Sequence, residues 1–227
     1  MTEEMVRYYA LRAREYDRVY TMERWRADLA VLHPRVATLF ADRRVFEVAC
    51  GTGYWTERLA AVALAVEAGD TNEETLAVAR ARPGVSDRVR LVRRDAYAPS
   101  AGAPTFDAGF AGLWLSHVDR ARMTEFLDAF HSHLLPGAPV LMFDERDAPA
   151  RSVPTSRTDA AGNRYEPRRL ASGDRFEIVK NFFDADEMRG LLAPYGRDVV
   201  YEALEAFWVV TYTASARAVR QSGDTEG

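Results

Sequence analysis

The segment from Val45 to Thr56, which reads VFEVACGTGYWT, constrains the fold more than any other part of the 227-residue chain. A short apolar run leads without a break into Gly51-x-Gly53, and an amphipathic segment follows directly. Glycine allows a tight turn and lets the backbone approach a ligand closely. In open α/β sheets ligands bind at the carboxyl edge of the strands, where such a turn lies. The segment therefore predicts an α/β fold with a ligand site after its first strand.

Short apolar runs alternate with amphipathic segments along most of the chain. The apolar runs predict strands at 45–49, 63–66, 89–92, 106–113, 140–143, 198–204 and 206–213. The amphipathic segments predict helices near 55–62, 72–81, 120–135 and 184–194. This alternation favours a parallel sheet with helices on both faces. The last two strands are joined so closely that they must be antiparallel neighbours.

Two segments lie outside this alternation. Residues 1–40 carry apolar side chains at helical spacing, and we interpret them as an N-terminal helical cap. Residues 146–181 form an insertion rich in turn signals, which predicts a β-hairpin with strands at 165–170 and 175–181. We therefore expect a single domain over residues 1–218, followed by a flexible tail at 219–227.

Composition and charge exclude several classes of function. The 30 basic and 34 acidic side chains give a net charge of −4, and no basic stripe is present, so we expect no nucleic-acid partner. No apolar stretch approaches the roughly 20 residues of a membrane span, and the acidic start is not a signal peptide, which predicts a cytoplasmic protein. The single cysteine, Cys50, cannot form an internal disulfide. The four histidines form no evident ligand set, so we expect no metal.

Two acidic residues follow predicted strands at the edge where the glycine turn lies. Asp70 ends the second strand, where a carboxylate can accept hydrogen bonds from both ribose hydroxyls of a nucleoside. Asp95 follows the third strand, where it can meet an adenine amino group. An NAD-dependent oxidoreductase is an alternative, but Thr56 stands where the dinucleotide fingerprint requires a third glycine.

The glycine turn resembles motif I of the class I S-adenosylmethionine (SAM)-dependent methyltransferases, in which an acid precedes Gly-x-Gly, as Glu47 does here. The likeness continues through a series of later motifs: Asp70, Asp95-Ala96, the strand at 106–110, the turn Leu135-Pro136-Gly137 and the closing antiparallel strand. It implies a Rossmann-like class I methyltransferase fold with a seven-stranded, mostly parallel sheet and an antiparallel last strand. It also implies SAM as cofactor, with S-adenosylhomocysteine as its product.

Within this family the chain is similar to small natural-product O-methyltransferases, one of which methylates a phosphonate oxygen. The shared patterns are Tyr8-Tyr9-x-x-Arg12-Ala13-x-x-Tyr16-Asp17, the stretch 51–56, Trp114-Leu-x-His117-Val118 and Phe176-x-Ile-Val-Lys180. The resemblance implies that the N-terminal helix closes over the cofactor. It places Tyr9, Arg12 and Tyr16 near the methionine carboxylate of the cofactor or near the substrate.

These patterns yield two sets of candidate residues. The candidates for cofactor binding are Tyr9, Arg12, Tyr16, Glu47, Gly51, Gly53, Trp55, Asp70, Thr71, Asp95 and Ala96. The candidates for substrate binding are Tyr8, Trp114, Arg168 and Lys180.

Two of the candidates are also predicted to be catalytic. His117 follows the fourth strand and could deprotonate a hydroxyl or donate to an anionic acceptor. Lys180, the only lysine, could bind a carboxylate or phosphonate oxygen.

The predicted function is therefore SAM-dependent methyl transfer to a small molecule, at an oxygen, in specialised metabolism. An N- or C-methyltransferase and a non-catalytic SAM-binding protein remain open alternatives. The sequence does not distinguish a monomer from a homodimer.

Overall fold

The computed structural model describes residues 2–149, 151 and 153–216. Its main sheet has seven strands in the order β3-β2-β1-β4-β5-β10-β9. The strands are β1 (Arg44–Val48), β2 (Ala65–Asp70), β3 (Val89–Arg93), β4 (Ala108–Gly112), β5 (Pro139–Glu145), β9 (Gly196–Ala203) and β10 (Phe207–Ala214). Strands β1 to β5 pair in parallel, whereas β10 runs antiparallel to both β5 and β9. The predicted seven-stranded, mostly parallel sheet with an antiparallel last strand is confirmed. The predicted tail at 219–227 lies outside the described residues.

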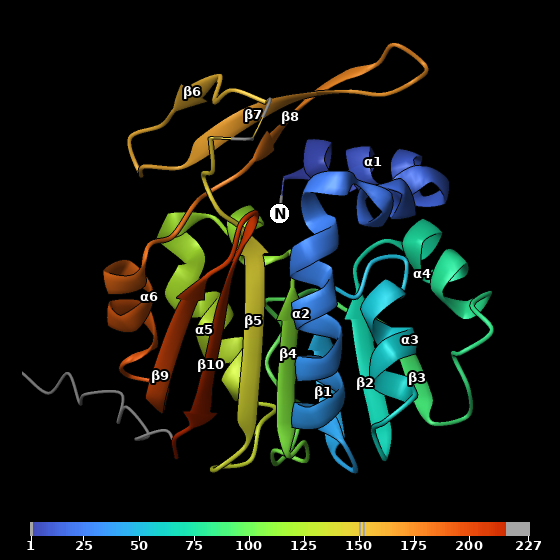
Figure 1. Cartoon of the computed structure of the whole chain (residues 1–227), viewed down its shortest axis with the longest axis vertical. Coiled ribbons are helices and arrows are strands. Elements are labelled where there is room, and N and C mark those ends of the chain that lie inside the picture. The colour runs from blue at the N-terminus through green and yellow to red at the C-terminus, as the bar shows by residue number, and fades with distance from the viewer. Residues whose placement is uncertain (1, 150, 152, 217–227) are drawn as a thin grey trace, which may run out of the picture.

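Helices cover both faces of the main sheet (Figure 1). One face carries α2 (Glu23–Phe40), α3 (Tyr54–Ala60) and α4 (Glu73–Arg80), and the other carries α5 (Met123–His131) and α6 (Ala185–Leu192). Successive strand residues point to opposite faces, so Val45 packs with α2 and α3, whereas Phe46 packs with α5. Both faces of the sheet are therefore buried, which explains the continuous apolar runs in the sequence.

The N-terminal segment contains α1 (Glu3–Arg12) and the 3₁₀-helix η1 (Ala13–Thr21), and it leads directly into α2. The Thr2 hydroxyl accepts a hydrogen bond from the Met5 amide and begins α1. Two residues of α1, Met5 and Tyr8, pack in a small apolar cluster with Phe176 and Ile178. This cluster joins the N-terminal segment to the insertion between β5 and α6.

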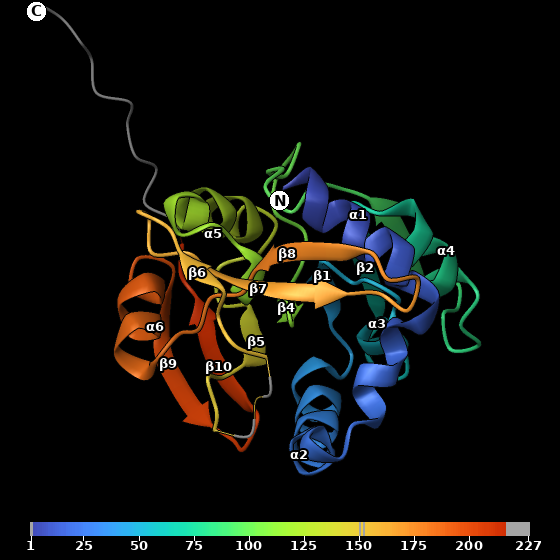
Figure 2. The same cartoon turned by 90° about the horizontal axis from the view of Figure 1, so that it is seen from above.

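The insertion forms a second, antiparallel sheet of three strands: β6 (Arg157–Thr158), β7 (Arg164–Arg169) and β8 (Arg175–Val179). Strands β7 and β8 are the predicted hairpin, whereas the two residues of β6 are too few to give a sequence pattern. Figures 1 and 2 show this sheet over the edge at which the parallel strands end, with α1 beside β8. Two short 3₁₀-helices, η2 (Leu115–His117) and η3 (Arg120–Arg122), follow β4 at the same edge.

Candidate active site

The glycine turn after β1 has a backbone conformation that requires glycine. Gly51 and Gly53 have φ angles of 55° and 78°, in the left-handed region that L-residues rarely adopt. A Cβ atom at Gly53 would lie 2.8 Å from the Cβ of Ala79 in α4. The turn therefore packs closely against α4, and α3 begins directly after it at Tyr54.

Asp70 ends β2 beside this turn and is held by three hydrogen bonds. Its Oδ2 atom accepts from the Gly51 amide at 2.9 Å, and its Oδ1 atom accepts from the Asn72 amide at 2.9 Å and the Thr75 hydroxyl at 3.1 Å. Burial raises the pKa of this carboxyl group, and the hydrogen bonds act against that rise. Because a carboxylate has about four acceptor sites and these bonds occupy three, Asp70 keeps capacity for about one further hydrogen bond from a ligand.

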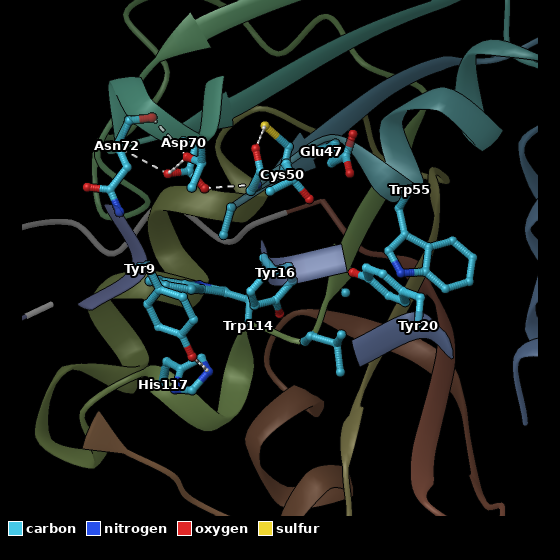
Figure 3. Close-up of a pocket in the computed structure, with 16 residues that line it drawn as sticks. Tyr9, Tyr16, Tyr20, Glu47, Cys50, Trp55, Asp70, Asn72, Trp114 and His117 are labelled. Atoms are coloured by element: carbon cyan, nitrogen blue, oxygen red, sulfur yellow. Dashed lines mark hydrogen bonds between the residues drawn. The ribbon is translucent and has the colours of Figure 1, made fainter. Parts of the chain in front are cut away.

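A cavity of about 630 Å³, which we call the glycine-loop cavity, lies beside Asp70 and the glycine turn (Figure 3). Six of the eleven predicted cofactor residues line it: Tyr9, Tyr16, Glu47, Gly51, Trp55 and Asp70. A smaller cavity shares Ala49, Asp70 and Trp114 with it and adds three more of the predicted residues: Thr71, Asp95 and Ala96. The structure thus gathers nine of the predicted residues around two adjoining cavities. Gly53 shapes the turn without lining either.

Buried polar atoms without hydrogen-bond partners face this region. Glu47 is 2% exposed, and within the described part of the chain its Oε2 atom has no partner. Burial raises the pKa of Glu47 to about 8. The indole nitrogens of Trp55 and Trp114 are likewise unpaired among the described residues. Buried polar groups are normally satisfied, so these atoms are candidate contacts for a polar ligand.

A second cavity, of about 1,040 Å³, lies under β7 and is called here the arginine-lined cavity. Its charged lining residues are Arg12, Arg24, Glu145, Arg168, Arg169 and Lys180. Four residues line both this cavity and the glycine-loop cavity: Tyr9, Tyr16, Leu113 and His117. The two cavities therefore meet at these four side chains.

Three of the four predicted substrate residues, Tyr8, Arg168 and Lys180, line the arginine-lined cavity. Arg12, predicted near the methionine carboxylate or the substrate, lines the arginine-lined cavity, and its guanidinium donates to the Tyr8 hydroxyl at 2.9 Å. Trp114, predicted beside the substrate, lines the glycine-loop cavity and its smaller neighbour instead.

His117 lies at the end of η2 and is 7% exposed. Its Nδ1 atom is 2.7 Å from the Val179 carbonyl oxygen, so Nδ1 carries the proton and donates. Its Nε2 atom therefore accepts from the Tyr9 hydroxyl, at 2.8 Å. Burial, reinforced by the positive charge of Lys180, lowers the pKa of His117 to about 4. The ring is consequently neutral at pH 7.

Lys180 is paired with acidic groups at the floor of the arginine-lined cavity. Its Nζ atom is 3.0 Å from Asp144 Oδ1 and 3.3 Å from Glu145 Oε2, and it donates to the Ser116 hydroxyl at 3.0 Å. All these groups are buried. Although burial opposes ionisation, the charges of Lys180 and Arg151 lower the pKa of Glu145 to about 2. The lysine therefore carries its charge inside an ion-pair network and is not an isolated cation.

The arginines differ in how far they are neutralised. Arg168 donates to Glu166 at 2.6 Å, and Arg24 pairs with Glu145 at 3.2 Å. Arg12 and Arg169 have no acidic partner among the residues that the structure describes. The positive charge of these two side chains is thus available to a ligand.

The structure adds residues that the sequence analysis did not single out. Tyr20 lines the glycine-loop cavity and stacks on Tyr54, with ring centroids 3.5 Å apart. Tyr20 follows Tyr16 by about one helical turn, so it lies on the same helical face. That spacing could have identified Tyr20 as a candidate from the sequence. Asn72 lines the same cavity, and its amide donates to the Val6 carbonyl at 3.2 Å. No sequence pattern distinguishes Asn72 from an ordinary residue at the start of a helix.

Over the described residues, no group of three or more His, Cys, Asp or Glu side chains is arranged to hold a metal ion. In the same part of the chain, no helix has the length and apolar character needed to cross a bilayer.

Comparisons with known proteins identify a family and several solved structures to which this chain is similar. The family described as "methyltransferase domain" matches residues 45–137, which include the glycine turn, Asp70 and Asp95. No curated protein sequence matches the chain. Among solved structures, the DhpI–SAH complex is 28% identical, with a TM-score of 0.77, and the alignment covers 95% of this chain and 97% of that one.

Two further structures are also similar to this chain. The DhpI–SAM–HEP complex is 28% identical, with a TM-score of 0.74 and coverage of 92% of this chain and 96% of that one. SAM-bound CalS10, an amino pentose methyltransferase from Micromonospora echinaspora involved in calicheamicin biosynthesis, is 22% identical, with a TM-score of 0.58 and coverage of 87% and 96%. CalS10 supports the fold alone.

The matched segment contains the glycine turn and both acids, and the DhpI complexes superpose over nearly the whole chain. Glu47, Gly51, Asp70 and Asp95 lie around two adjoining cavities. The chain thus carries a methyltransferase domain over residues 45–137, and the similar structures support a SAM-dependent methyltransferase with SAM as its cofactor.

Proposed function

We propose that this methyltransferase acts on a small anionic molecule of specialised metabolism and methylates a carboxylate or phosphonate oxygen. One observation carries the proposal: the glycine-loop cavity and the arginine-lined cavity meet at Tyr9, Tyr16, Leu113 and His117. A methyl donor in the first and an acceptor in the second would come together at this junction.

The charges of the arginine-lined cavity support an anionic acceptor. Arg12 and Arg169 have no acidic partner among the described residues, and Arg168 shares its single partner, Glu166, with Arg151. Guanidinium groups bind carboxylate and phosphonate oxygens through paired hydrogen bonds. The ammonium of Lys180 lies at the floor of the same cavity, where it adds positive potential although Asp144 and Glu145 offset its charge. A similar structure, the DhpI–SAM–HEP complex, contains a second ligand besides SAM.

The residues of the glycine-loop cavity fit the parts of SAM. In this proposal Asp70 accepts hydrogen bonds from the ribose hydroxyls, and Asp95 accepts from the adenine amino group. The unpaired Oε2 atom of Glu47 binds the amino group of the methionine part. Gly51 and Gly53 let the backbone come close enough for these contacts.

An anionic acceptor requires little acid–base chemistry from the protein. SAM supplies a methyl group on a positively charged sulfur, and its transfer leaves neutral S-adenosylhomocysteine. An ionised carboxylate or phosphonate oxygen is already a nucleophile, so the new O–CH₃ bond forms without removal of a proton. The protein then acts by orienting the acceptor, an effect that can contribute about 7–11 kcal/mol. Arg12 and Arg168 hold the anion, and His117 fixes the Tyr9 hydroxyl at the junction.

The Tyr9–His117 hydrogen bond favours one alternative, a hydroxyl acceptor. A neutral His117 could accept a proton, either directly or through Tyr9, and so activate an alcohol. Such an enzyme would depend strongly on His117 and little on Arg12 and Arg169. Methylation of nitrogen or carbon would require neither the arginines nor a fixed anion.

A matched acceptor panel tests the proposal. The purified enzyme is incubated with SAM and with carboxylates, phosphonates, alcohols and amines that share the same carbon skeletons, and mass spectrometry identifies each methylated product. We expect methyl esters of the anions and no product from the alcohols or amines. Product only from an alcohol or an amine contradicts the proposal. SAM binding without transfer to any member of the panel would instead support a non-catalytic SAM-binding protein.

A further inference from the structure

The arginine-lined cavity extends along the N-terminal segment. Residues of that segment line it at positions 9, 12, 16, 19 and 22, which is the spacing of one helical face across α1, η1 and the start of α2. At a rise of about 1.5–2 Å per residue, thirteen residues of helix span on the order of 20 Å. Figure 2 shows the segment leading from α1, beside β8, to α2 at the far side of the molecule. The cavity is therefore long enough to have two distinct ends.

Two of the lining cations, Arg12 and Arg168, lie at the α1 end. Arg12 donates to the hydroxyl of Tyr8, and the Tyr8 and Tyr9 rings contact each other at 4.9 Å. Arg168 is paired across the β7–β8 ladder with Phe176, so both side chains project from the same face of the hairpin. Phe176 packs on Tyr8 at 5.5 Å, which brings this face of the hairpin against α1. Arg12 and Arg168 are thus close to the junction at Tyr9 and His117.

The other end of the cavity is apolar. Val19, Met22 and Trp25 line it from η1 and α2, and Val153 lines it from the insertion. Met22 and Val153 are half-buried, so they present apolar surface to the cavity. The one charged side chain of this part of the helical segment that lines the cavity among the described residues, Arg24, pairs with Glu145 at 3.2 Å. This end therefore favours hydrocarbon over a second charged group.

We infer that the acceptor is an amphipathic anion, with its methylated anionic group at Tyr9, His117, Arg12 and Arg168 and an apolar chain or ring that extends to Met22 and Val153. This inference rests on the proposed function and adds the shape and polarity of the substrate. A small anion without an apolar body would fill only the α1 end. The apolar end would then contribute nothing to its binding.

A homologous series of acceptors tests the inference. The kcat/KM of the wild-type enzyme is measured for methyl-, propyl- and pentylphosphonate and for the matched alkanoates. Full burial of one methylene group corresponds to about a fourfold gain, so we expect kcat/KM to rise at least tenfold from the shortest to the longest acceptor. A flat or falling series would overturn the inference while leaving methylation of anions intact. No methylation of any anion would instead overturn the proposed function, and the inference with it.

The variant Met22→Asn places a polar group at the apolar end. Met22 is the N-cap residue of α2, a position where asparagine is a preferred residue, so the variant is expected to fold. We expect the ratio of kcat/KM for the longest acceptor to that for the shortest to fall about tenfold. Leu11→Asn is the matched control, because Leu11 is 54% exposed on the same N-terminal segment and does not line the cavity. An unchanged ratio in Met22→Asn, or an equal fall in Leu11→Asn, would overturn the placement of the apolar body.

Discussion

The Tyr9 hydroxyl donates to Nε2 of His117 across 2.8 Å, while Nδ1 of the same ring donates to the Val179 carbonyl. One imidazole thereby joins three parts of the chain: α1, the turn after β4 and the end of β8. These bonds fix the tautomer of His117 and occupy both of its ring nitrogens. His117 therefore acts first as a positioning residue at the junction of the two cavities.

The activity toward an anionic acceptor is expected to be insensitive to His117 titration. The pKa of His117 is lowered from 6.5 to about 4, so the ring stays neutral from pH 6 to 8. With SAM saturating, neither the imidazole nor a carboxylate acceptor changes charge in that interval, and kcat/KM for a carboxylate should be nearly flat. His117→Ala should reduce kcat only modestly, through a less ordered Tyr9. A rate loss of a thousandfold in this variant would indicate that His117 removes a proton from the acceptor.

The same depressed pKa predicts acid sensitivity of the fold. Between pH 6.5 and 4 the unfolded chain protonates this histidine and the folded chain does not, so stability falls as the pH falls through that window. We expect this one group to cost about 2–3 kcal/mol at pH 4 relative to pH 7. Urea unfolding at the two pH values should show a smaller loss for His117→Asn than for the wild type. An equal loss of stability in both proteins would contradict the lowered pKa of His117.

Removal of the Asp70 carboxylate should weaken SAM binding. Hydrogen bonds to charged groups contribute about 1.5–3 kcal/mol, so Asp70→Ala should raise the Kd for SAM at least tenfold in calorimetry. Glu73→Ala is the control, because Glu73 is an exposed acid of the neighbouring helix that pairs with Arg80. Unchanged SAM affinity in a folded Asp70→Ala protein would place the ribose contact elsewhere. Glu67 is no substitute, since it binds Arg90 and Arg94.

Glu47 is expected to release a proton when SAM binds. Its pKa of about 8 leaves it largely protonated at pH 7, and contact with a positively charged amino group favours the ionised form. Calorimetry in buffers of different ionisation enthalpy should therefore show release approaching one proton per SAM bound at pH 7. Glu47→Gln should bind SAM more weakly and without this release. Release of the same size in the variant would assign the proton to another group.

Loss of Lys180 should affect both stability and turnover. Removing one partner of a buried ion pair costs about 3–5 kcal/mol, because Asp144 and Glu145 would remain buried with less compensation. We expect Lys180→Met to lose stability in urea unfolding and to lower kcat/KM for an anionic acceptor, with SAM affinity nearly unchanged. The double variant with Asp144→Asn should recover part of the lost stability. If Lys180→Met alone were as stable as the wild type, the ion pairs of Lys180 with Asp144 and Glu145 would not stabilise the fold.

The arginines at the α1 end of the arginine-lined cavity should determine acceptor binding. Arg12→Gln and Arg168→Gln are each expected to raise the KM for an anionic acceptor, and together to lower kcat/KM about a hundredfold, with little change in the Kd for SAM. Arg14→Gln is the matched control, because Arg14 is exposed on the same N-terminal segment and lines neither cavity. Equal losses in the Arg14 variant would point to a nonspecific effect of charge.

Sequence patterns predicted the main sheet because each of its strands carries a local signal. Both faces of β1 and β5 are buried, and their apolar runs are unmistakable, whereas the two exposed residues of β6 carry no pattern. Asp70 and Asp95 were predictable for a topological reason: the carboxyl ends of parallel strands meet at one edge. Their placement required no knowledge of side-chain packing.

Side chains whose position depends on tertiary packing were harder to place. The helical spacing of Tyr9, Arg12 and Tyr16 predicts that they share one face of a helix, but it does not predict which surface that face contacts. In the structure Arg12 lines the arginine-lined cavity. Trp114 follows a strand end, yet the direction of its ring depends on how the chain turns into η2. The partner of Lys180, Asp144, is 36 residues away in sequence, and no local pattern links the two.

The origin of the cavity linings has an evolutionary consequence. Every cation lining the arginine-lined cavity within the described chain comes from the first 40 residues or from the insertion at 146–181, whereas the glycine turn and Asp70 belong to the sheet. Replacement of the insertion can alter acceptor choice without changing the lining of the glycine-loop cavity, whereas the N-terminal segment contributes Tyr9, Tyr16 and Tyr20 to that cavity. Exchange of the insertion at 146–181 is therefore a direct way to change the substrate that this fold accepts.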